Sequence, residues 1–165
     1  MNRILIYYSS EGHTRLVAEK ISEMLGCDVF ELQLVKPYPT KGFLKFYYGG
    51  RDSVFHFSRA FNKPFPDLSN YEVVLLATPI WAGTVSAPMY SYLKKASFLQ
   101  KDLYLIATCS GGDVSKCFST IKKIKTDGHT RGEISFVNPT EATLQQDIER
   151  LKAFSSAVLS NDSFQ

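Results

Sequence analysis

The residues of this chain that are best suited to chemistry lie in a short polar turn close to its start. The sequence Ser9-Ser10-Glu11-Gly12-His13-Thr14 follows an apolar run at residues 4–8, and apolar residues recur after it at helical spacing, from Leu16 to Leu25. A strand that turns directly into a helix aims backbone N–H groups and the positive end of the helix dipole at one point. The turn has no lysine, which distinguishes it from a Walker-type nucleotide loop. We therefore predict a phosphate site formed by N–H and hydroxyl groups.

The single tryptophan of the chain lies in a second turn of this kind, after an apolar run at residues 72–77. The residues of this turn are Thr78, Pro79, Ile80, Trp81, Ala82, Gly83 and Thr84. A flat ring at the end of a strand can stack on a planar heteroaromatic ligand, and Gly83 lets the backbone approach such a ligand closely. The alternative is a tryptophan packed in the core. The neighbouring phosphate-type turn and the flanking Pro79 favour ligand contact.

A third turn follows the apolar run at residues 102–108. It reads Thr108-Cys109-Ser110-Gly111-Gly112-Asp113, and its two glycines again permit close approach of the backbone. Its N–H groups could bond the polar edge of a ring system. Asp113 is predicted to cap the next helix. Cys109 has no nearby cysteine or activating base, so we expect a small buried side chain rather than a redox thiol.

These turns need a framework in which strands and helices alternate. Such alternation predicts a parallel sheet covered by helices on both faces, with ligands bound at the carboxyl ends of the strands. The expected strands are residues 4–8, 28–33, 72–77, 102–108 and 133–137, and the expected later helices are residues 87–96, 114–125 and 140–159, the last with Thr140 as its N-cap.

Residues 37–70 break this regular pattern. Residues 42–48 could form a short helix, and residues 64–66 are predicted to be extended. The aromatic side chains of this segment are expected to pack on the core, and the alternatives are a lid over the site, with Gly49-Gly50 as its joint, or a self-association surface. Lysines 116, 122, 123 and 125 are expected to form a solvated helix face, with a docking patch for an acidic partner as the alternative.

Length and composition set further limits. The chain has 165 residues, which indicates a single domain, residues 1–165, with one core. A net charge of +3 is too small to indicate nucleic-acid binding, and no apolar run is long enough to span a membrane. The three cysteines form no C-x-x-C pair, which argues against a zinc site or a disulfide framework, and no secretory signal is expected before the first strand. These features predict a cytoplasmic protein.

The three turns together resemble those of the flavodoxin family, which binds FMN. The first turn, beginning at Tyr8, is similar to the phosphate loop of the family, although Ser9 and Glu11 stand where many members have threonines. The second is similar to the loop that stacks an aromatic residue on the isoalloxazine ring, and the third falls where the last flavin loop lies. The resemblance implies a flavodoxin-like, three-layer, doubly wound α/β fold with a five-stranded parallel sheet in the order 2-1-3-4-5.

The resemblance also implies roles for individual residues. Around the FMN phosphate it places Ser9, Ser10, Glu11, Gly12, His13 and Thr14, with the carboxylate of Glu11 directed to solvent. The residues that it places along the ribityl chain and the ring are Thr78, Pro79, Ile80, Trp81, Ala82 and Gly83. Those that it places at the other side of the ring or at its pyrimidine edge are Ser110, Gly111 and Gly112. Many flavodoxins have a tyrosine in the third loop, whereas this chain has two glycines there, so one flavin face is expected to be open.

The predicted function is electron transfer by bound FMN, to or from a redox partner protein or a small-molecule acceptor. The prediction is compatible with a homodimer of this chain. The alternative is an FMN-dependent NAD(P)H:quinone or FMN oxidoreductase, which an open flavin face would favour. A third hypothesis is a related binding or regulatory domain without flavin. Receiver domains of this topology need an acidic cluster at the strand ends, which residues 7–10 and 76–78 lack.

Overall fold

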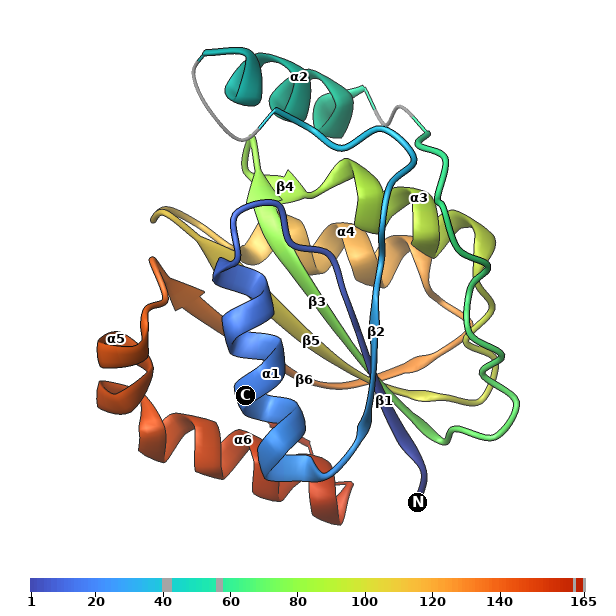
Figure 1. The fold of residues 1–165 in the computed structure, drawn as a ribbon. Coiled ribbons are helices and arrows are strands. Elements are labelled where there is room, and N and C mark those ends of the chain that lie inside the picture. Colours follow the sequence, from blue (N-terminus) through green and yellow to red (C-terminus); the bar gives the residue numbers. More distant parts are fainter. Residues whose placement is uncertain (40–42, 56–57, 162, 165) are drawn as a thin grey trace.

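The computed structural model describes residues 1–39, 43–55, 58–161 and 163–164. Five parallel strands form its sheet in the order β2-β1-β3-β5-β6, and the short β4 pairs antiparallel with the end of β3 (Figure 1). The predicted fold and strand order are therefore confirmed. The strands are β1 (Arg3–Tyr7), β2 (Asp28–Glu31), β3 (Val73–Trp81), β4 (Thr84–Val85), β5 (Asp102–Cys109) and β6 (His129–Val137). The helices are α1 (His13–Leu25), α2 (Phe43–Val54), α3 (Ala87–Lys95), α4 (Ser115–Ile124), α5 (Glu141–Gln146) and α6 (Ile148–Ser160).

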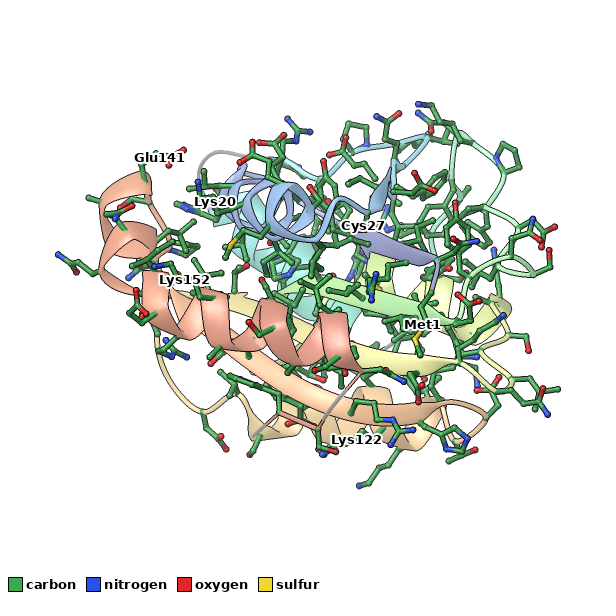
Figure 2. The ribbon with its side chains drawn as sticks, turned by 90° about the horizontal axis from the view of Figure 1, so that it is seen from below. Met1, Lys20, Cys27, Lys122, Glu141 and Lys152 are labelled. Carbon is green, nitrogen blue, oxygen red and sulfur yellow. The ribbon has the colours of Figure 1, made fainter. Side chains whose placement is uncertain are left out.

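The continuous apolar runs form the central strands because helices cover both faces of the sheet. Successive side chains of a strand point to opposite faces, so Leu5 packs with α1 and α6 while Ile4 and Ile6 pack with α3 and α4. Figure 2 shows the side chains that fill the space between the sheet and these helices. The result is two hydrophobic layers, one on each face, that hold the strand ends in fixed positions.

Several predicted segments differ in extent from the structure. β6 begins at His129 rather than at residue 133, and β2 ends at Glu31 rather than at residue 33. Two helical segments also differ. The helix expected at residues 140–159 is divided at Asp147 into α5 and α6, and Leu144 of α5 packs in the same apolar cluster as Leu151 of α6. The predicted cap at Thr140 is confirmed, because its side chain accepts a hydrogen bond from the Thr143 N–H at 3.2 Å. The helix expected at 42–48 is instead α2, which ends at Val54, and residue 42 lies outside the described residues.

The second predicted turn is a β-hairpin rather than a loop. β3 runs on through Trp81, which pairs with Thr84 of β4. Ala82 and Gly83 form the two-residue connection, and both have positive φ, 48° and 75°. Two-residue hairpins with positive φ at both positions match the twist of the flanking strands. The hairpin therefore carries Trp81 on a rigid extension of the sheet.

The solvated lysine face expected on helix 114–125 is wrong for Lys125, which directly follows α4. Lys125 is 8% exposed, and its ammonium donates a hydrogen bond to the carbonyl of Ala96. Burial lowers the pKa of Lys125, and nearby Asp127 opposes that change. Lys122 pairs instead with Glu133 of β6 at 2.7 Å.

The two edges of the sheet have different surroundings. At one edge, the short β2 carries Asp28, which accepts a hydrogen bond from the Tyr71 hydroxyl at 2.6 Å, and Glu31, which pairs with Arg15. At the other edge, Phe164 forms a parallel bridge with Gly132 of β6. Glycine is required there, because a Cβ at position 132 would lie 2.8 Å from the Cβ of Phe164.

Candidate ligand cavity

A cavity of about 410 Å³ lies at the carboxyl ends of β1, β3 and β5. This is the edge at which ligands bind in open α/β sheets. The sequence-predicted residues that line it are Ser9, Ser10, Glu11, His13, Thr14, Pro79, Ile80, Trp81, Ala82 and Ser110. The structure thus brings all three predicted turns to one cavity.

The phosphate-type turn has the expected form. Gly12 adopts a φ of +94°, and α1 begins at the next residue. The N–H of Leu16 bonds to the carbonyl of Gly12 at 2.9 Å, so the N–H groups of the three residues before Leu16 have no acceptor within the helix. Ser9 Oγ accepts from the Gly12 N–H at 3.1 Å and fixes the turn. The positive end of α1 and the hydroxyls of Ser9 and Ser10 therefore meet at this part of the cavity.

Two hydrogen bonds tie this turn to the strands beside it. The hydroxyls of Thr14 and Thr108 lie 2.7 Å apart, and both residues are buried. His13 Nδ1 lies 2.9 Å from the carbonyl oxygen of Pro139, which follows β6. A carbonyl oxygen only accepts, so Nδ1 carries the proton of this bond. These contacts hold the start of α1 against β5 and the β6–α5 connection.

Aromatic side chains surround Trp81 at the opposite end. Its ring meets Tyr8 at 5.6 Å between centroids and Tyr38 at 4.8 Å, both edge to face. Gly49 of α2 also faces it, because a Cβ there would lie 3.3 Å from Trp81 Cε3. Trp81 is half-buried at the cavity rather than enclosed in the core. The ring is therefore fixed by its neighbours with part of its surface at the cavity.

Five predicted site residues are not among those that line the cavity: Gly12, Thr78, Gly83, Gly111 and Gly112. Thr78 is buried, and its hydroxyl lies 2.9 Å from that of Ser86. Gly83, Gly111 and Gly112 are exposed, and all three have positive φ, which suits glycine in tight turns. The predicted N-cap at Asp113 is wrong by one residue, because Val114 is the N-cap of α4. The Asp113 carboxylate, one residue earlier, accepts a hydrogen bond from the Ser115 N–H at 2.8 Å.

Part of the cavity wall lies outside the predicted turns and consists of Tyr38, Pro39, Gly49, Gly50, Asn138 and Pro139. The first four belong to residues 37–70, where the pattern gave no element with clear bounds. The alternative of a lid comes closest, because Gly49 and Gly50 of α2 contribute to the wall. Cys109 was expected to be buried, but it is half-buried and lines the cavity.

The electrostatics of the cavity come chiefly from backbone and hydroxyl groups. Among its lining residues in the described part of the chain there is no lysine or arginine, and Glu11 is exposed. Behind the Tyr38 ring lies a charged cluster in which Tyr38, Arg51 and Arg59 all donate hydrogen bonds to the fully buried carboxylate of Asp52. Burial alone would raise the pKa of Asp52, but these hydrogen bonds outweigh it and the pKa is lowered.

The fold and the cavity define the class of this protein: a doubly wound α/β protein with a ligand cavity across three strand ends. The sequence profile of the flavodoxin family, described as flavodoxin, matches residues 2–151. The chain belongs to the flavodoxin family. Comparison with curated proteins found no match.

Solved structures agree with this assignment at the level of the fold. A proposed flavoprotein from Bacteroides eggerthii superposes with a TM-score of 0.73 at 18% identity, covering 92% of this chain and 98% of that one. A flavoprotein from Lactobacillus acidophilus in complex with FMN gives 0.71 at 16% identity, covering 92% and 98%. A flavodoxin from Streptococcus pneumoniae gives 0.58 at 16% identity, covering 98% and 99%.

Two further observations concern the described residues alone. None of the helices described is both long and apolar enough to cross a membrane. Over the same residues, no three histidine, cysteine or acidic side chains gather in a way that could hold a metal ion.

Proposed function

We propose that this protein binds one FMN noncovalently in the cavity and transfers electrons through it. The observation that carries this proposal is the meeting of a phosphate-type turn, an aromatic wall and a polar loop at three neighbouring strand ends. Family membership and the FMN complex of the Lactobacillus acidophilus flavoprotein support the same ligand. When bound, FMN supplies the electron-transfer chemistry, and the chain supplies binding and electrostatics.

The residues of the cavity fit the two ends of FMN. The start of α1, with Ser9 and Ser10, would hold the phosphate through N–H and hydroxyl donors. Pro79, Ile80 and Trp81 would border the ring, and Ser110 would meet it from the turn that follows β5. A cavity of about 410 Å³ also lies within the usual range of about 300–1,000 Å³ for small-molecule sites.

The test is an FMN titration of the apo protein, followed through Trp81, which is the only tryptophan. We expect FMN to quench its emission and riboflavin to bind more weakly, because riboflavin lacks the phosphate. Ser10→Ala should weaken FMN binding and leave riboflavin binding unchanged. A purified protein without flavin absorbance, whose Trp81 emission does not respond to FMN, would contradict the proposal.

The second candidate function is FMN-dependent reduction of quinones or free FMN by NAD(P)H. It is favoured by the third loop, whose Gly111 and Gly112 are exposed and place no aromatic ring at the cavity. Steady-state oxidation of NADH and NADPH with a quinone acceptor separates the two functions. Turnover would assign the reductase. If neither nucleotide is oxidised, and the chemically reduced protein passes electrons to a protein acceptor, the protein is an electron carrier.

A further inference from the structure

Tyr38 brings a second aromatic ring to the cavity from a segment outside the three predicted turns. It lines the cavity, and its ring centroid lies 4.8 Å from that of Trp81 at an interplanar angle of 74°. The two rings therefore form a corner. Tyr38 is 6% exposed, so its position is set by the residues packed around it.

The phenol of Tyr38 is held from two sides. Its hydroxyl donates to Asp52 Oδ2 at 2.8 Å and accepts from Arg59 Nε at 2.9 Å. The guanidinium carbon of Arg59 also lies 4.5 Å from the centre of the Tyr38 ring, a cation–π contact. Both polar bonds of the hydroxyl are thus used, and they fix the position of the hydroxyl oxygen and with it the long axis of the side chain.

A charged group of each sign adjoins the hydroxyl of this ring, and Arg51 binds the same carboxylate as Arg59. Asp52 is fully buried and Arg59 is about one-quarter exposed, and the two groups are hydrogen-bonded to each other. Charges that are shielded from water act over longer distances than exposed ones. Each of these side chains therefore contributes to the potential in the cavity, with opposite sign.

We propose that Tyr38 is a positioning residue for the flavin ring, and that the Asp52–Arg59 pair behind it helps to set the reduction potential of the bound flavin. This inference rests on the proposed function. Reduction places electrons at the ring, so the charge of Arg59 favours the reduced protein and the charge of Asp52 opposes it. The tyrosine absent from the third loop would have its counterpart on a different segment.

The first test separates the ring from the phosphate. Tyr38→Ala is expected to weaken FMN and riboflavin binding by the same factor, about tenfold or more, because contact between an aromatic side chain and the flavin ring does not involve the phosphate. Tyr38→Phe keeps the ring and should retain most of the affinity. A Tyr38→Ala variant that binds riboflavin as well as the wild type would overturn the positioning role.

The second test uses the sign of the charge. Arg59→Gln is expected to lower the midpoint potential and Asp52→Asn to raise it. Each should change the ratio of reduced to oxidised protein about tenfold at fixed potential, or about 30 mV for a two-electron couple. The matched controls are Arg131→Gln and Asp102→Asn, which remove an ion pair of 2.7 Å at the amino ends of β5 and β6 and should leave the potential unchanged.

A purely structural role would move the potential in the same direction in both variants, because both loosen the same contacts, and that result would overturn the inference. If Asp52→Asn does not fold, Arg59→Lys decides, since it keeps the charge but not the planar fork. A potential close to that of the wild type supports the inference, and one equal to that of Arg59→Gln overturns it. Failure of the wild type to bind FMN would instead overturn the proposed function itself.

Discussion

Replacing Gly49 with alanine is expected to press a methyl group against Trp81, whereas the same change at Gly50 is not. Both glycines lie inside α2, where alanine is favoured over glycine by about 0.8–1 kcal/mol. A Cβ at Gly50 would meet only the Cβ of Ala82, at 3.8 Å, which is an ordinary contact. Gly50→Ala should therefore raise the free energy of unfolding by roughly 0.5–1 kcal/mol.

At Gly49 the balance reverses. The new Cβ would lie 3.3, 3.5 and 3.6 Å from three atoms of the Trp81 ring. Favourable carbon contacts lie at about 3.5–4.0 Å, and overpacking costs about 1–3 kcal/mol. The ring is held on other sides by Tyr8 and Tyr38, so it can yield only a little. Gly49→Ala should therefore lower the free energy of unfolding by about 1 kcal/mol.

Thermal unfolding of the two variants, followed by circular dichroism, measures this difference. For a chain of this length 1 kcal/mol corresponds to a Tm shift of about 2–4 °C, so the variants should shift in opposite directions. Gly49→Ala should also change the near-ultraviolet signal and emission of Trp81. Equal stabilisation by both changes, with Trp81 unaffected, would refute the packing of α2 on this ring.

Three further predictions follow from the cavity wall and the cluster behind it. Thr14→Val and Thr108→Val should each lower the free energy of unfolding by about 1–3 kcal/mol, and the double variant should lower it by less than the sum of the two. Additive changes in denaturant unfolding would contradict the hydrogen bond between these two hydroxyls. Cys109 lines the cavity, so it should react with a thiol reagent in the apo protein and be protected when FMN is bound. Burial raises the pKa of Cys117 to about 12, so Cys117 should stay unlabelled at neutral pH. Mass spectrometry of the labelled peptides measures both outcomes. Because the pKa of Asp52 is lowered in the folded state, its ionised carboxylate stabilises the protein above a pH of about 4, and this stabilisation is lost as the pH falls further. In Asp52→Asn, the free energy of unfolding measured in urea should therefore decrease less steeply at acid pH.

The framework of the fold could be predicted because its strands are buried on both faces. β3 and β5 have continuous apolar runs that no amphipathic helix would show. The start of β6 is different, since Thr130, Arg131 and Gly132 lie at the sheet margin and carry no apolar signal. The division at Asp147 has no sequence signal either, because Leu144 and Leu151 also suit one continuous helix.

The cavity could be predicted where it depends on local chain geometry. The turn at Gly12 and the start of α1 follow from short-range rules for strands, glycines and helix ends. Tyr38 and Gly49 could not be placed, because their position at the cavity depends on contacts with Trp81 that are distant in sequence. Hydrogen bonds to Asp52 secure that arrangement, and neither composition nor spacing encodes them.

The edges of the sheet have a consequence for behaviour at high concentration. An open strand edge invites pairing with another chain and is a common route to aggregation. Here β2 is short and presents the carboxylates of Asp28 and Glu31, while Phe164 pairs with β6 at Gly132. Charged side chains thus discourage an incoming strand from pairing with β2, and Phe164, the last residue that the structure describes, already pairs with part of β6 at the other edge.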